Sequence, residues 1–186
     1  EFVGEYVSIE EAVEMAVSQA GPICLLDMGD NVGGGSAADS TLIAHEIHLR
    51  GDTTGFVCLY DVASQDAARD AGVGATLTLS MGGKTDDRHG EPLTAEVMVK
   101  SLHAGTFEES EIRHGGNTHF DMGPTTVVTT ETGLTISLTS RRVAPVSLGV
   151  VTSIGLDPGE FQVLIAKGVH APVAAYAPVC SELIRV

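Results

Sequence analysis

Nowhere in its 186 residues does the sequence contain an apolar run of the roughly 20 residues that cross a membrane. It also has no basic segment followed by an apolar one, so no signal peptide is expected. Positive charge is scarce: ten Lys and Arg stand against 25 Asp and Glu, for a formal net charge of −15. Because nucleic acids and anionic membrane surfaces would be repelled, neither is expected as a partner, and the protein is expected to be soluble.

Cysteine is scarce as well, with Cys24, Cys58 and Cys180 each in an apolar context. An odd number of cysteines without CxxC spacing favours buried, reduced thiols and hence a cytoplasmic location. The sequence also lacks the GxSxG pattern of a nucleophile elbow and the chain order of a Ser-His-Asp hydrolase. Pattern alone therefore gives no complete catalytic centre.

The 43% of hydrophobic residues is enough for a full core, and these residues follow two patterns. Up to about residue 74, helical periodicity alternates with short apolar runs, which predicts helices around a parallel sheet. From about 75 to 144, apolar and polar residues alternate, which predicts antiparallel strands. We expect an α/β fold, a mixed sheet flanked by helices with an antiparallel β-rich subdomain in the middle of the chain. Residues 1–186 would form a single domain, its α/β part about 1–74 and 145–186, its β-rich insertion about 75–144.

Three polar residues are predicted to cap helices. Ser8 and Glu11 form a capping box before one helix. Asp39 precedes the apolar pattern of residues 40–49, and Asp61 precedes an Ala-rich segment ending at Gly72, so both are expected as N-caps.

The stretch DMGDNVGGGS at 27–36 follows a predicted strand over about 23–28 and precedes a predicted helix. Gly33, Gly34 and Gly35 place backbone N–H groups where a ligand can approach, near a helix N-terminus. The alternative is a crossover loop that needs small residues to turn. The stretch lacks the motifs of a P-loop or a dinucleotide site, and Asp27 and Asp30 would repel phosphate unless a cation lay between them. A neutral or amide-containing ligand, or another domain, is the preferred contact.

Three further polar loops, at 84–89, 113–123 and 167–170, hold titratable or amide groups beside glycine. Lys167 and His170 come directly after a predicted strand, where α/β folds place ligand groups. Lys167 is a candidate partner for a substrate carboxylate, and the alternative is an ion pair with a local Asp or Glu.

His114, His119 and Asp121 are residue types that bind divalent metals. Their spacing matches no standard zinc pattern, so surface hydrogen bonding is the preferred interpretation.

Five motifs occur in order along the chain: DMGDNVGGG at 27–35, GGKT at 82–85, HGG at 114–116, TSRR at 139–142 and AKGVHAP at 166–172. Together they closely resemble the C-terminal region of the microcystinase C (MlrC-type) metallopeptidase family. The resemblance runs from about Phe2 to Val186.

This resemblance implies a bacterial cytoplasmic zinc hydrolase, whose namesake takes part in microcystin degradation by cleaving the linearised toxin. In the intact enzyme a zinc-bound water would attack an amide carbonyl. The family's zinc ligands lie in a larger N-terminal region, so the resemblance assigns no metal ligand and no catalytic residue to this chain, and the isolated chain is expected to be inactive.

The resemblance also implies that two loops face the cleft between the two regions. The candidate substrate-binding residues are Asp30, Asn31, Gly33, Gly34, Gly35, Lys167 and His170. The expected partners are the N-terminal metal-binding region, a peptide or amide substrate and, in an oligomer, a second copy of the chain. The alternatives are a non-catalytic interaction or oligomerisation domain and a small-ligand-binding domain.

Overall fold

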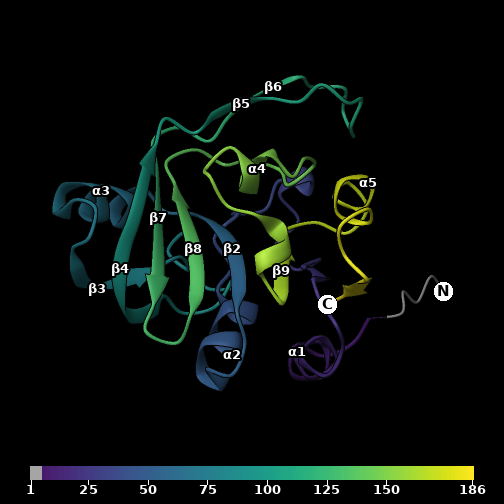
Figure 1. Ribbon diagram of the computed structural model, residues 1–186, viewed down its shortest axis with the longest axis horizontal. Coiled ribbons are helices and arrows are strands. Elements are labelled where there is room, and N and C mark those ends of the chain that lie inside the picture. The colour runs from purple at the N-terminus through teal and green to yellow at the C-terminus, as the bar shows by residue number, and fades with distance from the viewer. Residues whose placement is uncertain (1–5) are drawn as a thin grey trace.

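The computed structural model describes residues 6–186 (Figure 1). Residues 1–5, where the family resemblance begins, lie outside the described residues. The helices are α1 (Ile9–Ser18), α2 (Leu42–Arg50), α3 (Val62–Ala71), α4 (Gly149–Thr152) and α5 (Val173–Tyr176), with short 3-10 turns η1 (Val32–Gly34) and η2 (Pro158–Glu160). The strands are β1 (Ile23–Leu26), β2 (Gly55–Tyr60), β3 (Thr76–Met81), β4 (Leu93–His103), β5 (Thr106–Glu108), β6 (His119–Asp121), β7 (Thr125–Thr130), β8 (Leu134–Thr139), β9 (Val163–Ala166) and β10 (Glu182–Arg185).

Eight of the strands form one mixed sheet in the order β10-β1-β9-β2-β8-β7-β4-β3. Neighbours from β10 to β8 run parallel, whereas β8, β7, β4 and β3 pair antiparallel. The predicted α/β class with a mixed, helix-flanked sheet is therefore confirmed. Strands β5 and β6 pair only with each other and form an arm that extends over one end of the sheet (Figure 1).

The short parallel strands carry apolar side chains on both faces of the sheet. Helices cover both faces because these side chains must be removed from water. One apolar cluster joins α1, α2 and α3 to Leu25, Val57 and Ile136 of the sheet. A second cluster joins α4 and α5 to Leu26 and Phe56 on the opposite face of the sheet. Leu26 is adjacent to Leu25 in β1, and Phe56 is adjacent to Val57 in β2. None of the helices within residues 6–186 has the length and apolar composition that crossing a membrane requires.

The connections leave the sheet in opposite directions at β1 and β9, which lie side by side. The chain passes from β1 to α2 on one face and from β9 to α5 on the other face. In open α/β sheets, ligands bind outside the carboxyl ends of the strands at such a switch point. The loops after β1 and β9 are therefore the place to look for a site.

Two of the three predicted caps are confirmed, and one is wrong. Ser8 accepts a hydrogen bond from the Glu11 N–H, and Asp61 accepts one from the Ser64 N–H. Asp39 does not cap α2, which begins at Leu42 with Thr41 in the cap position. The Asp39 carboxylate instead accepts hydrogen bonds from the backbone of loop 84–89, because that loop, distant in sequence, packs beside it.

Candidate functional site

The loop at residues 27–36, here called the glycine loop, leaves the carboxyl end of β1. Asp27 begins it by accepting a hydrogen bond from the Asp30 N–H at 3.1 Å. Gly33, Gly34 and Gly35 are exposed at its outer side. The N–H groups of Gly34 and Gly35 donate back to the carbonyls at positions 31 and 32, so these two are used within η1. Gly35 has φ of 92°, which glycine adopts without strain.

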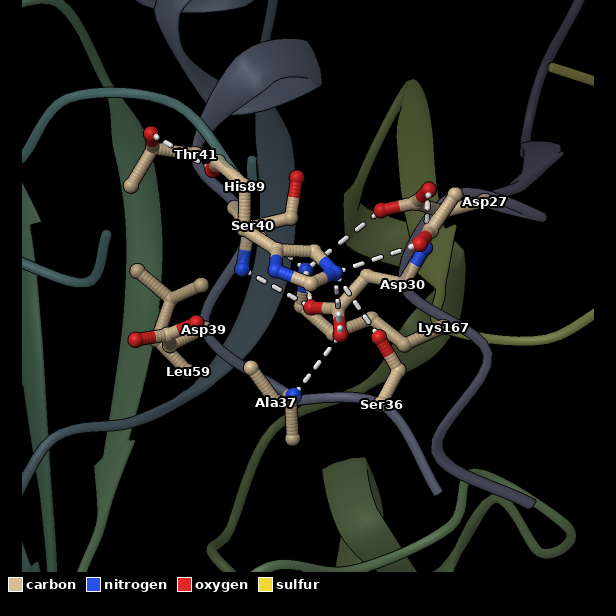
Figure 2. A network of polar contacts seen from close by, with 12 residues as sticks. Asp27, Asp30, Ser36, Ala37, Asp39, Ser40, Thr41, Leu59, His89 and Lys167 are labelled. Carbon is tan, nitrogen blue, oxygen red and sulfur yellow. Dashed lines mark hydrogen bonds and ion pairs between the residues drawn. The ribbon is translucent and has the colours of Figure 1, made fainter. Parts of the chain in front are cut away.

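Asp30 and Lys167 form a buried ion pair between the ends of β1 and β9 (Figure 2). The Lys167 ammonium lies 2.9 Å from Asp30 Oδ2 and 3.5 Å from Asp27 Oδ2, and it donates to the Ser40 carbonyl at 2.8 Å. Asp30 is 0% exposed and Lys167 4%. Lys167 thus pairs with local acidic residues, the alternative left open by the sequence.

The Asp30 carboxylate also holds the far end of the glycine loop. It accepts hydrogen bonds from the Ala38 N–H at 2.7 Å and the Ser40 N–H at 2.8 Å. Burial alone would raise the pKa of Asp30, but the Lys167 charge and these N–H groups lower it below its ordinary value. Asp30 is therefore ionised at neutral pH, and its oxygens are engaged inside the protein.

The second predicted loop, after β9, contacts the glycine loop directly. The Val32 N–H donates to the Lys167 carbonyl at 3.3 Å. The Asn31 amide oxygen lies 3.4 Å from where a side chain on Gly168 would begin, so the two loops are in close contact. Asn31 is half-buried at this junction, and His170 is exposed further along. The structure thus brings the predicted residues of the two loops together.

Loop 84–89 clamps the glycine loop from the other side through His89. Its Nδ1 lies 2.7 Å from Asp86, and its Nε2 lies 2.8 Å from Ser36 Oγ and 3.3 Å from the Gly29 carbonyl oxygen. The sequence marked this loop as polar but gave no sign of the contact with Ser36, because 53 residues separate the two side chains.

Ser36, His89 and Asp86 have the connectivity of a hydrolase triad, which the sequence did not predict. Burial opposes protonation of His89, but the hydrogen bond with Asp86 and the charge of Asp30 raise its pKa above 6.5. The Asp86 carboxylate and the Gly29 carbonyl are both acceptors, so each ring nitrogen of His89 faces a group to which it must donate, and a ring protonated on Nε2 cannot accept the serine proton. The cluster therefore fastens the glycine loop rather than activating Ser36.

Replacing His89 with glutamine should destabilise the fold by about 1 kcal/mol at pH 6, the usual scale for such hydrogen bonds. A group whose pKa is raised by folding stabilises fully below its unfolded pKa, here about 6.5, and loses this contribution as the pH rises through the folded pKa. Urea unfolding of both proteins from pH 6 to 9 should therefore show the difference shrinking. For the exposed control, His119→Gln, the difference in unfolding free energy from the wild-type protein should stay near zero at every pH. A difference for His89→Gln that grows with pH would contradict the stabilising role of protonated His89.

A surface hollow of about 360 Å³ lies between the glycine loop, the arm and the segment after β8. We call it the arm hollow. It is lined by Gly33, His114, Gly115, Asn117, His119, Phe120, Asp121, Arg142, Val143, Ala144 and Val146. Three of the five sequence motifs thus meet around one space, although more than 100 residues separate the first from the last.

The arm hollow holds the residues considered as metal ligands, but they do not form a metal site. His119 lies 3.2 Å from Glu108, and Asp121 is paired with Arg141. Across residues 6–186, no group of three or more His, Cys, Asp or Glu side chains is arranged to hold a metal ion.

An open mixed sheet flanked by helices, with two loops meeting at its switch point beside a polar hollow, defines a domain of the α/β class. The sequence matches the family described as MlrC C-terminus over residues 25–186, and the chain therefore belongs to that family. The family predicted from the five motifs is thus confirmed.

The fold is also similar to a crystal structure of a protein named "Putative metallopeptidase" from Mesorhizobium sp. BNC1, with a TM-score of 0.90 and 25% sequence identity. The similarity covers 100% of this chain and 37% of the other, so this chain spans little more than a third of that protein's length. No curated protein has significant similarity to the chain.

Proposed function

We propose that this chain forms one wall of the substrate cleft of a longer zinc metallopeptidase, whose metal ligands lie outside residues 6–186. Membership of the MlrC C-terminus family and likeness to a protein named as a metallopeptidase support a peptidase-associated domain. The observation that carries the cleft proposal is the meeting of the β1 and β9 loops at the switch point beside the arm hollow.

The predicted site residues divide into two roles in this proposal. Asp30 and Lys167 are positioning residues, because both are buried and their polar atoms hold the glycine loop against the β9 loop. Asn31 and the exposed glycines at 33–35 face the cleft, together with His170, and contact a peptide or amide substrate. The zinc site and its chemistry belong to the preceding region, and residues 1–186 act as one domain beside it.

The proposal is tested by Asn31→Ala in the longer protein loaded with zinc. No side-chain hydrogen bond of Asn31 occurs within residues 6–186, so its loss should leave the fold intact and remove a polar contact to substrate. We expect kcat/KM for short linear peptides to fall by about tenfold. Released amine measures turnover, and gel filtration measures the assembly.

The control is Thr78→Ala, an exposed change on β3 at the sheet edge, which should leave turnover and size unaltered. If Asn31→Ala changes the oligomer size while turnover per intact assembly stays normal, the domain serves subunit contacts instead. Unchanged turnover and unchanged size would also overturn the cleft proposal.

A further inference from the structure

Arg142 is held in a fixed orientation at the edge of the arm hollow. Its Nε–H donates to the Ala37 carbonyl at 3.0 Å, at the end of the glycine loop. Its guanidinium carbon lies 5.0 Å from the centre of the Tyr60 ring, a cation–π arrangement. The residue is nevertheless exposed. One edge and one face of the guanidinium are thus engaged by the protein, and the terminal N–H groups remain for a ligand.

Most cations of this acidic chain are already paired with carboxylates. The paired ones are Arg50, Arg69, Lys84, Arg113, Arg141 and Lys167. Within the described part of the chain, no carboxylate lies within ion-pair distance of Arg142. Asp121, the acidic residue in the hollow lining, is paired with Arg141. The chain has 25 acidic residues, and none of those described pairs with Arg142. An arginine that is held in a fixed orientation without such a partner is suited to bind the carboxylate of a ligand.

The chemistry of the hollow fits a small, singly charged carboxylate. A guanidinium presents parallel N–H donors that match the two oxygens of a carboxylate. The lining adds polar groups from His114 and Asn117 and apolar ones from Phe120 and Val146, which suit the backbone and side chain of a peptide. The net charge of −15 disfavours multiply charged anions.

We propose that Arg142 binds the C-terminal carboxylate of a short peptide in the arm hollow. This inference rests on the proposed function, and it names the substrate class as peptides with a free C-terminus. It also reassigns the role first expected of Lys167, whose ammonium is 4% exposed and occupied by Asp30 and Ser40. Among the residues that line the arm hollow, Arg142 is the exposed cation.

The test is NMR titration of the backbone amide signals of Gly115 and Asn117, which line the arm hollow, in the full 186-residue chain with N-acetyl-alanyl-alanine and its C-terminal amide. The acid should bind at least about tenfold more tightly than the amide, because only the acid offers a charge-assisted pair. Arg142→Gln should abolish this preference. Lys100→Gln also removes one positive charge, from the exposed face of β4, and this variant should retain the preference for the acid over the amide. Inorganic phosphate should compete weakly.

Equal binding of acid and amide, no binding of either, tighter binding of phosphate, or an unchanged preference in Arg142→Gln would each overturn the proposal. Since this readout needs no metal and no turnover, it separates the two proposals. Carboxylate binding here together with a longer protein that hydrolyses no peptide would leave the Arg142 site standing and remove the peptidase role.

Discussion

Replacing Lys167 with methionine is expected to lower the free energy of unfolding by about 3–5 kcal/mol, the range for breaking a buried ion pair from one side. Methionine fills similar space but leaves Asp30, which is 0% exposed, without its cation. The Ser40 carbonyl also loses its donor. Since the Asp30 carboxylate holds the segment that follows the glycine loop, the loop should become less ordered as the fold is destabilised.

The loss should depend on pH in a defined direction. Folding lowers the pKa of Asp30, so its ionised form stabilises the wild-type protein above its unfolded pKa, and this contribution fades as the pH falls through the folded pKa. Without Lys167, burial favours the protonated form, which needs no cation. The difference between Lys167→Met and the wild-type protein should therefore be largest near neutral pH and should narrow toward pH 4.

Urea unfolding measures both effects, with Lys100→Met as the matched control. Lys100 lies on the exposed face of β4, so its replacement should change stability by no more than about 0.5 kcal/mol. A loss below about 1 kcal/mol for Lys167→Met would mean that the buried pair does not hold the two loops together.

The second large effect concerns hydrolysis. The 186-residue chain with added zinc should cleave linear peptides at least about 1,000-fold more slowly than the longer protein, because a metal-activated nucleophile supplies much of the rate. Released amine at equal protein concentration gives the comparison. Cleavage by the isolated chain at a rate near that of the longer protein would contradict the proposal that the metal ligands lie outside residues 6–186.

Local patterns predict the elements of this fold well. The apolar runs predict β2 and β9, the alternating segments predict β3, β4 and the β7–β8 hairpin, and Asp61 is a correct cap because its hydrogen bond is local. The prediction of Asp39 as a cap is wrong for the opposite reason. Its carboxylate accepts hydrogen bonds from Lys84 and Thr85, which lie 45 and 46 positions further along the chain, and no local pattern indicates such contacts.

The site shows the same division between local and distant information. Motifs single out the loops after β1 and β9, and the structure brings these two loops into contact because strand ends in a parallel sheet meet at one edge. They do not reveal that the Lys167 ammonium pairs with Asp30. They also do not reveal that His89 contacts Ser36, or that Arg142 donates to the Ala37 carbonyl, 105 positions away. These facts depend on which side chain reaches which space after folding.

Zinc binding by the 186-residue chain tests the central claim most directly. We expect no zinc to be held more tightly than about micromolar by calorimetric titration, because the His and acidic side chains of residues 6–186 form no ligand cluster. One zinc ion per chain bound far more tightly than this, with ligands from these residues, would show that the reactive centre lies within this domain.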